Sequence, residues 1–464
     1  MKHTDISQII FHGENYSGSV VRVAGWVRTA RDGKNMAFLA LNDGTSLKHV
    51  QIVIDKSKFA AEELSACMKN GVSVEAEGVV VPAVVAEGGY EINADKITLL
   101  GDCPNDYPLQ KKYHSLEYLR TVPHLRVRTN TFNAMLRVRS KISYALHRFF
   151  QENGYTYIHT PIITGSDCEG AGEIFRVTTN GYEDAKLAKD EAEYIARDFF
   201  RRKAGLTVSG QLEGEVAAMA MGKIYTFGPT FRAENSNTPR HAAEFWQIEP
   251  EVAFAKLPDI IEIAESMIKF VIKAVLDECS DEIDFFEKAF EKGLRAKLES
   301  VVASDFAVLD YTEAIEILKK ADVEFSYPVE WGLDLQTEHE RYITEKVFGK
   351  PVFVTNYPKK IKSFYMKQND DGKTVAATDL LVPGVGEIIG CSEREADYEK
   401  LLSAMKERGM NLDDYKGYME LRKYGSVPHS GFGLGLERIM MYVTGIGNIR
   451  DVQLYSRTPG DLMA

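Results

Sequence analysis

Two arginines and a glutamate stand close together in Phe227–Glu251, which reads FGPTFRAENSNTPRHAAEFWQIEPE. Arg232 and Glu234 end an apolar run, a polar turn-forming segment follows, and a second β-prone run closes the stretch. This pattern predicts two strands joined by a loop. Guanidinium groups bind phosphate bidentately and keep their charge. Arg232 on a strand, with Arg240 and His241 near the loop, therefore predicts a polyphosphate site, although an ordinary hairpin with exposed charges would contain the same residue types.

Two later segments carry residues that suit the same ligand. Asp379 and Glu387 lie on β-like runs around a Pro-Gly turn, and two carboxylates facing a nucleotide would hold Mg²⁺. The segment Gly431–Arg438, GFGLGLER, predicts a glycine-rich strand that leads into a helix. A nucleotide could lie close to this backbone, with Arg438 directed at phosphate. The segment matches neither a P-loop nor a dinucleotide-binding fingerprint.

Length and composition limit the classes of protein. A chain of 464 residues suggests two or three domains, and 44% hydrophobic with 27% charged residues is typical of a globular protein. No apolar run is long enough to cross a membrane, and the first residues lack a secretion signal. Five scattered cysteines predict reduced thiols and a cytoplasmic location. A net charge of −12 argues against general coating of nucleic acid but allows a local basic face.

The first hundred residues predict a small all-β module. Between Ser19 and Leu100, five β-prone runs are separated by turn signals, with a helical run before the fourth. This order suggests an oligonucleotide-binding (OB) barrel. Phe38 and Gln51 fall on the middle strands, where such barrels stack on and read unpaired bases. The alternative is that Phe38 belongs to the core and Gln51 is an ordinary solvated strand residue.

The residues after the barrel predict a linker and then a helical element. Gly101–Val127 is rich in proline and basic residues and has little periodicity, as in an interdomain hinge. Apolar residues then recur at helical spacing from Phe132 to Phe150. Pro161 interrupts the following apolar strand, Tyr155–Ile163, which places that strand at a sheet edge or a subunit contact.

The remaining chain predicts alternating helices and strands. Gln211 and Glu215 are four residues apart in a helix start, so they can share one face. The patterns of residues 256–279 and 285–320 are mostly helical. The charge-dense run Trp331–Glu345 fits either a helix cap or the wall of a site, and the sequence does not decide between them.

Taken in order, the helix with the Pro161 strand, the Phe-Arg-x-Glu segment and GFGLGLER resemble motifs 1, 2 and 3 of class II aminoacyl-tRNA synthetases. The likeness is strongest to the aspartyl, asparaginyl and lysyl subclass and covers about Val20 to Pro459. The asparagine-specific members are most similar, through the segments CEGAGE, TVSGQLEGE, FRAENSNTPRHAAEFW, GEIIG and YVTGIGNIRDV. The resemblance implies an α+β protein: an N-terminal OB β-barrel for the anticodon followed by a class II catalytic domain, an antiparallel sheet flanked by helices.

The resemblance also implies domain limits and site residues. Residues 1–104 would form the barrel, 105–130 the hinge and 131–464 the catalytic domain, with a homodimer built on motif 1. Arg232 and Arg438 would be catalytic. The implied ATP ligands are Arg232, Glu234, His241, Phe245, Glu387, Gly435 and Arg438. The implied Mg²⁺ ligands are Asp379 and Glu387, the amino-acid ligands are Glu169, Gln211, Glu215 and Arg394, and the anticodon ligands are Phe38, Gln51 and Glu91.

The implied reaction is ATP-dependent ligation of asparagine to tRNA(Asn) through an asparaginyl-adenylate. Aspartyl enzymes of the subclass carry a lysine, in QSPQxxK, that faces the substrate carboxylate. Here SGQLEGE has no lysine and places Glu215 nearby, where it could accept from an amide and repel aspartate while Arg394 donates to the amide oxygen. The alternatives are an aspartyl-type enzyme, a paralogue that amidates aspartate, and a non-catalytic RNA-binding relative.

Overall fold

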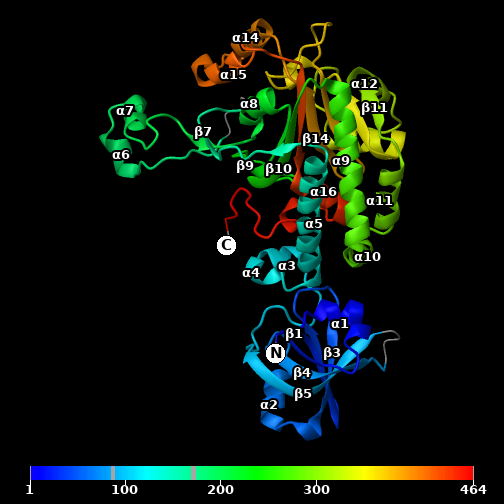
Figure 1. The fold of residues 1–464 in the computed structure, drawn as a ribbon. Helices are drawn as coiled ribbons and strands as arrows, with labels where there is room; N and C mark the ends of the chain where they lie inside the picture. Colours follow the sequence, from blue (N-terminus) through cyan, green and yellow to red (C-terminus); the bar gives the residue numbers. More distant parts are fainter. Residues whose placement is uncertain (1, 85–88, 169–173, 463–464) are drawn as a thin grey trace. The chain divides into compact units, whose positions relative to one another are not determined.

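The computed structural model describes residues 2–84, 89–168 and 174–462, and the chain divides into two compact units, Met1–Ala134 and Met135–Ala464 (Figure 1). The first unit holds a closed five-stranded barrel in the order β1-β2-β3-β5-β4. Its strands are β1 (Val20–Asp32), β2 (Met36–Asn42), β3 (Val50–Asp55), β4 (Ser73–Pro82) and β5 (Tyr90–Gly101). The helix α2 (Ala61–Cys67) precedes the fourth strand, so the predicted barrel is confirmed.

Alternation along the strands decides which side chains fill the barrel. In β2, Ala37, Leu39 and Leu41 are buried in the core, whereas Phe38 between them is only half-buried and lies outside the core cluster. A strand places successive side chains on opposite faces, so Phe38 is on the outer face. The short helix α1 (Ile6–His12) contributes Ile6 and Ile9 to the same core.

The second unit is built on an eight-stranded sheet in the order β11-β12-β13-β14-β15-β10-β9-β6. Its strands are β6 (Thr156–Tyr157), β9 (Lys223–Phe231), β10 (Glu244–Ala253), β11 (Ala307–Asp310), β12 (Val352–Thr355), β13 (Ala377–Val382), β14 (Gly386–Glu393) and β15 (His429–Gly435). The six central strands, from β12 through β13, β14, β15 and β10 to β9, pair in antiparallel fashion, as expected for the fold class. The two edge pairs, β11–β12 and β6–β9, are parallel.

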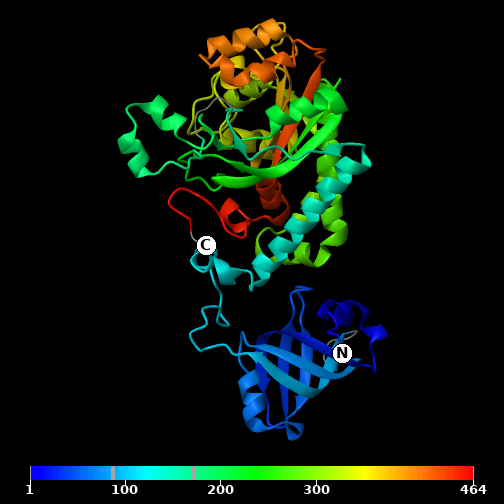
Figure 2. The same cartoon turned by 60° about the vertical axis from the view of Figure 1, so that its left-hand side comes forward.

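Long helices cover this sheet. α9 (Leu257–Glu278) packs on β13, β14 and β15, and α16 (Leu436–Thr444) packs on β10 and β15. α5 (Asn130–Glu152) runs beside α9 in both views (Figures 1 and 2), with the Phe149 and Phe270 rings 5.5 Å apart. α8 (Gln211–Met221) packs on β9 and β10. No helix in the described ranges is long and apolar enough to span a bilayer.

Smaller elements complete the second unit. They are β7 (Ile163–Thr164), α6 (Tyr182–Leu187), α7 (Glu191–Ala196), β8 (Gly205–Leu206), α10 (Ser280–Ala289), α11 (Leu294–Ala303), α12 (Tyr311–Lys319), α13 (Thr337–Arg341), α14 (Tyr398–Glu407) and α15 (Lys416–Glu420). α6 and α7 project from the body of the unit in both views (Figure 2).

Two local expectations need correction. The strand expected over Tyr155–Ile163 is instead two separate two-residue strands, β6 and β7, on either side of Pro161, because proline cannot donate a ladder hydrogen bond. The stretch 285–320 is mostly helical, as predicted, and the correction there is limited to β11, whose four residues pair with β12. Asp310 then caps α12 by accepting a hydrogen bond from the Thr312 amide at 2.8 Å.

Candidate active site

Glycines on the two neighbouring strands β14 and β15 leave room for side chains at the base of the site. Gly390 in β14 pairs with Gly433 in β15, and Gly431 pairs with Glu251 in β10. A Cβ atom added at Gly431 would lie 2.2 Å from the Glu251 carboxylate, and one at Gly433 would lie 3.3 Å from the Gln247 amide. Any side chain at Gly431 would therefore displace Glu251. The glycine-rich segment is thus required by close packing of carboxylate and amide side chains against the strand.

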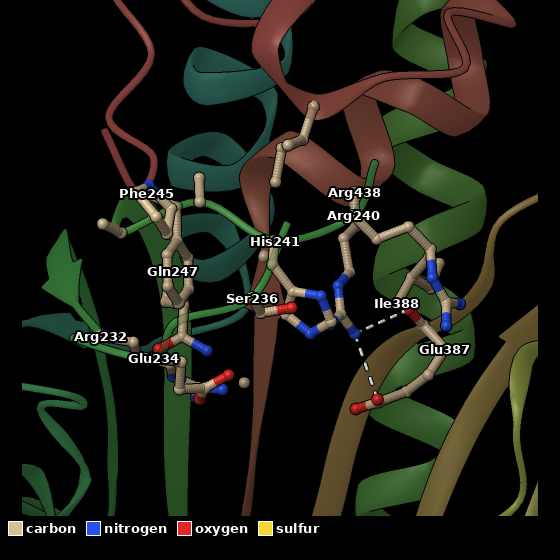
Figure 3. A pocket seen from close by; sticks show the side chains of 16 residues that line it. Arg232, Glu234, Ser236, Arg240, His241, Phe245, Gln247, Glu387, Ile388 and Arg438 are labelled. Carbon is tan, nitrogen blue, oxygen red and sulfur yellow. Dashed lines mark hydrogen bonds and ion pairs between the residues drawn. The ribbon is translucent and has the colours of Figure 1, made fainter. Parts of the chain in front are cut away.

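The residues expected to bind ATP line one cavity. Arg232 and Glu234 follow β9, His241 precedes β10, and strands and helix α16 supply the rest. The cavity is lined by all seven: Arg232, Glu234, His241, Phe245, Glu387, Gly435 and Arg438 (Figure 3). The Arg232 guanidinium carbon lies 5.4 Å from the centre of the Phe245 ring. The structure thus brings together residues up to about half the chain apart.

Guanidinium groups at this cavity are held by carboxylates. Arg438 Nη1 donates to Glu387 Oε2 at 3.1 Å and to the Glu387 carbonyl at 2.9 Å. Arg240, which also lines the cavity, donates to Glu340 Oε2 at 3.1 Å and to the Val385 carbonyl at 2.6 Å. Burial, followed by Arg438, lowers the pKa of His241. The cavity therefore presents guanidinium groups in fixed positions, which suits a polyphosphate.

Glu340 resolves the expectation left open for Trp331–Glu345. It lies in α13, is buried, and holds Arg240 at the edge of the cavity. Glu340 therefore supports the site through Arg240 without lining the cavity itself. Sequence reasoning missed Glu340 as an individual residue because nothing in its local pattern distinguishes it from other acidic residues in the run.

Asp379 and Glu387 bracket Gly390. A Cβ atom at Gly390 would lie 3.4 Å from Glu387 Oε1 and 3.7 Å from Asp379 Oδ1, so both carboxylates face the same opening. In the described part of the chain no group of three or more metal-ligating side chains forms a metal site. Two carboxylates nevertheless fit Mg²⁺, which commonly takes one or two protein carboxylates and completes its shell with phosphates and water.

Next to this cavity, Glu215 lies at the centre of a buried polar cluster. Its Oε1 accepts from Gln211 Nε2 at 2.9 Å and from the Tyr418 hydroxyl at 3.0 Å. Its Oε2 accepts from Arg422 Nη2 at 2.7 Å and lies 3.0 Å from His429 Nε2. Although burial opposes the charged form, Arg422 and His429 hold the pKa of Glu215 well below its usual range. Glu215 is therefore a charged, fully buried carboxylate.

Arg394 has its own carboxylate partner in the same cluster. It pairs with both oxygens of Glu251, with Nε to Oε2 at 3.2 Å, and also donates to Ser392. Its Nε lies 3.9 Å from Glu215 Oε1. Burial raises the pKa of Glu251, and the paired Arg394 guanidinium opposes that rise. The cluster thus combines two carboxylates, Glu215 and Glu251, with two guanidinium groups, Arg394 and Arg422.

Sequence reasoning placed Gln211, Glu215 and Arg394 in this region but missed their partners. Tyr418, Arg422 and His429 lie more than 200 residues from Glu215, and Glu251 was treated only as part of a strand. Glu169, the fourth residue expected to bind the amino acid, lies outside the residues that the structure describes.

In the barrel, the three residues expected to bind the anticodon lie together. Gln51 Nε2 donates to Glu91 Oε2 at 2.9 Å across the parallel pair of β3 and β5. Arg31 Nη2 donates to Gln51 Oε1 at 3.1 Å, and its guanidinium carbon lies 5.6 Å from the centre of the Phe38 ring. An aromatic ring, an amide and an arginine on one outer face match the chemistry that binds unpaired bases.

Comparison with known proteins gives concordant matches over the whole chain. Residues 115–459 match the family described as tRNA synthetases class II (D, K and N), and residues 21–100 match the OB-fold nucleic acid binding domain family. A protein of Acetivibrio thermocellus named asparagine--tRNA ligase is 55% identical over 99% of both chains. A protein of the same name from Clostridium novyi is 54% identical over 98% of both.

Solved structures give the same result. The Pyrococcus horikoshii asparaginyl-tRNA synthetase complexed with asparaginyl-adenylate is 33% identical, covers 100% of both chains and has a TM-score of 0.87. An Entamoeba histolytica asparaginyl-tRNA synthetase in complex with asparaginyl-adenylate is 28% identical over 97% of both chains, with a TM-score of 0.81.

Proposed function

The chain belongs to the class II tRNA synthetases (D, K and N), and we propose that it ligates asparagine to tRNA(Asn) in two steps, with ATP as the energy source. In the first step asparagine and ATP give asparaginyl-adenylate and pyrophosphate. In the second step the asparaginyl group passes to the tRNA and AMP leaves. The observation that carries this proposal is the cavity lined by all seven expected ATP ligands, beside a buried cluster with balanced charges.

The chemistry of the first step requires no side-chain nucleophile. An oxygen of the asparagine carboxylate attacks the α-phosphorus of ATP, and the bond from that phosphorus to the pyrophosphate oxygen breaks. Arg232 would contact the α-phosphate and the carboxylate, and Arg438 would bind the γ-phosphate with His241. The adenine would stack on Phe245 and contact Glu234. Catalysis then comes from positioning and from cationic stabilisation of the charge that develops on phosphorus.

We place Mg²⁺ at Asp379 and Glu387, where two carboxylates face one opening above Gly390. A divalent cation bound there would neutralise phosphate charge and orient the leaving pyrophosphate. Gly435 lies at the junction of β15 and α16 and would let the nucleotide approach the backbone.

The amino-acid side chain would lie against the buried cluster. Gln211 and Glu169 would receive the α-ammonium group, while Arg394 and Glu215 would face the amide. Glu215, Glu251, Arg394 and Arg422 contribute two negative and two positive charges. A neutral amide keeps this balance, whereas an aspartate carboxylate adds an uncompensated negative charge to a buried site, which is unfavourable.

In the second step a hydroxyl of the tRNA 3′-terminal ribose takes the asparaginyl group. Phe38, Gln51 and Glu91 would contact the anticodon through stacking and hydrogen bonds.

We also propose a homodimer built on motif 1. β6 is the last strand on its side of the sheet, and large apolar side chains nearby are exposed to solvent: Tyr144, Tyr157, Ile162 and Ile163. A second copy of the chain would bury these side chains. Sedimentation equilibrium tests this proposal, and a monomer at micromolar concentration would contradict it. The cytoplasmic location expected from the cysteines stays a prediction; all five are free and buried.

ATP–pyrophosphate exchange tests the proposed reaction. Asparagine and aspartate should be assayed in parallel at matched concentrations with Mg²⁺, followed by charging of tRNA(Asn). We expect exchange with asparagine alone. Exchange with aspartate alone would contradict the proposed substrate, and no exchange with either amino acid would contradict the proposed enzyme class.

A further inference from the structure

A lysine that sequence reasoning did not single out forms an ion pair with one of the two expected metal ligands. Lys362 Nζ donates to Asp379 Oδ2 at 2.5 Å. The two side chains are only 15% and 13% exposed. The ammonium also lies 3.9 Å from the centre of the Tyr357 ring, and the Tyr357 hydroxyl hydrogen-bonds the same carboxylate. Asp379 is therefore already engaged by a cation and a hydroxyl.

The surrounding acidic groups keep this ammonium charged. Although burial lowers the pKa of Lys362, the carboxylates of Asp379 and Glu387 raise it above its ordinary value. Glu387 also pairs with Arg438, and Glu340 pairs with Arg240. Each of these three carboxylates thus has a cationic partner. Without Lys362, Asp379 would be a buried carboxylate beside the like charge of Glu387, which is costly.

An ammonium at this position conflicts with a divalent cation. Mg²⁺ requires carboxylate oxygens at about 2.0–2.1 Å in near-octahedral geometry. Lys362 holds Oδ2 of Asp379 at hydrogen-bond distance, and its charge would repel a cation bound between Asp379 and Glu387. Because Lys362 pairs with Oδ2 and the oxygen nearest Gly390 is Oδ1, the ammonium opposes a cation at that opening by its charge and does not occupy the cation's position.

We propose that Lys362 is the resident counter-ion of Asp379 and that its positive charge weakens binding of the divalent cation until ATP supplies compensating negative charge. This inference rests on the proposed function only in taking Mg²⁺ and ATP as the ligands. Its consequence is an order of binding. The metal binds weakly by itself and tightly with the nucleotide, because the phosphates supply both further oxygen ligands and negative charge that compensates for the Lys362 ammonium.

Other contacts hold Lys362 at this position. Arg408 Nη2 donates to the Lys362 carbonyl at 2.7 Å. Asp334 offers a second acidic partner. Burial raises the pKa of Asp334, and Lys362 lowers it, so the two groups interact electrostatically already.

The test measures binding of Mn²⁺ to the full-length protein without nucleotide, by the electron paramagnetic resonance signal of free Mn²⁺. Lys362→Met keeps an unbranched side chain and removes the charge. We expect it to bind Mn²⁺ at least about tenfold more tightly than the unchanged protein, because removing a neighbouring unit charge relieves a direct repulsion. Lys360→Met, at an exposed position two residues earlier, is the matched control and should bind as the unchanged protein does.

A second substitution assigns the new affinity to the site. Asp379→Asn should abolish the gain in Lys362→Met but change little in the Lys362-containing protein, whose Asp379 is already engaged. Equal Mn²⁺ binding by the Lys362→Met variant and the unchanged protein would overturn the proposal. So would tight, Asp379-dependent Mn²⁺ binding to the unchanged protein without nucleotide, a result that needs no variant at Lys362 to fold.

These measurements are independent of catalysis. Failure of pyrophosphate exchange with intact Mn²⁺ behaviour would count against the proposed reaction and leave the role of Lys362 standing. Normal pyrophosphate exchange together with unchanged Mn²⁺ affinity in Lys362→Met would count against the role of Lys362 and leave the proposed reaction standing.

Discussion

Replacement of Glu215 by glutamine tests whether charge balance selects asparagine. Glutamine keeps the size of the side chain and removes one negative charge, so the set Glu215, Glu251, Arg394 and Arg422 changes from neutral to one net positive charge. The lost charge lies close to Arg394, whose Nε is 3.9 Å from Glu215 Oε1. Arg394 is the group expected to face the substrate side chain, so the change acts on the discriminating contact.

The expected size of the effect follows from this distance. Two unit charges at about 4 Å interact by about 4 kcal/mol at an effective dielectric constant of 20. Relaxation of Arg422 and entry of water reduce this value, and we expect about 1.4–2.8 kcal/mol to reach the substrate, which is a change of about 10- to 100-fold. The ratio of kcat/KM for aspartate to that for asparagine should rise by this factor. The protein should also lose about 3–5 kcal/mol of stability, since Arg422 loses its buried partner.

Pyrophosphate exchange measured with both amino acids at 20 °C gives the ratio, and circular dichroism confirms that the variant is folded. Tyr418→Phe is the matched control, because it removes a hydrogen bond to Glu215 Oε1 and leaves the charge in place. The reasoning is refuted if Glu215→Gln leaves the ratio within about twofold of the original, well below the tenfold that 1.4 kcal/mol represents. It is also refuted if Tyr418→Phe shifts the ratio as strongly.

Three further predictions address the ATP cavity, the barrel and the response to pH. Arg438→Lys keeps the charge but loses the planar guanidinium, whose Nη1 donates to Glu387 and whose geometry suits phosphate, so exchange should fall by about 10²–10³-fold. Activity within threefold of the original would contradict a role at phosphate. Phe38→Ala should weaken tRNA(Asn) binding by about 1–3 kcal/mol through lost stacking, while exchange without tRNA stays unchanged; equal loss of exchange would point to misfolding. Although burial raises the pKa of Glu215, Arg422 and His429 hold it below its ordinary value, so its contribution to stability is present above that value and lost as the pH falls through the folded-state pKa. The free energy of unfolding, measured in urea, should therefore decrease less between pH 6 and pH 3 in Glu215→Gln than in the unchanged protein. An equal decrease in both proteins would exclude Glu215 as a source of acid sensitivity.

The fold class and seven of the residues that line the cavity were predicted from the sequence alone. Each depends on local signals: five β-prone runs with a helix before the fourth predict the barrel, and a turn between two β-prone runs predicts β9 and β10. The seven expected ATP ligands come from three short motifs, and the strands that carry these motifs are neighbours in the sheet. Local pattern together with the resemblance to the class II motifs was sufficient here, because the glycines, arginines and carboxylates of each motif lie within a few residues of one another.

Only the tertiary structure decided the partners of those residues. Arg422 reaches Glu215 across 207 positions, and Lys362 reaches Asp379 from a loop outside every motif. Neither contact has a local signal, because a lysine or arginine in a polar run is usually solvated. Burial distinguishes Arg422 and Lys362 from solvated arginines and lysines. Packing places these carboxylates away from water, and a buried carboxylate stays charged only beside a cation that the folded chain brings to it from elsewhere.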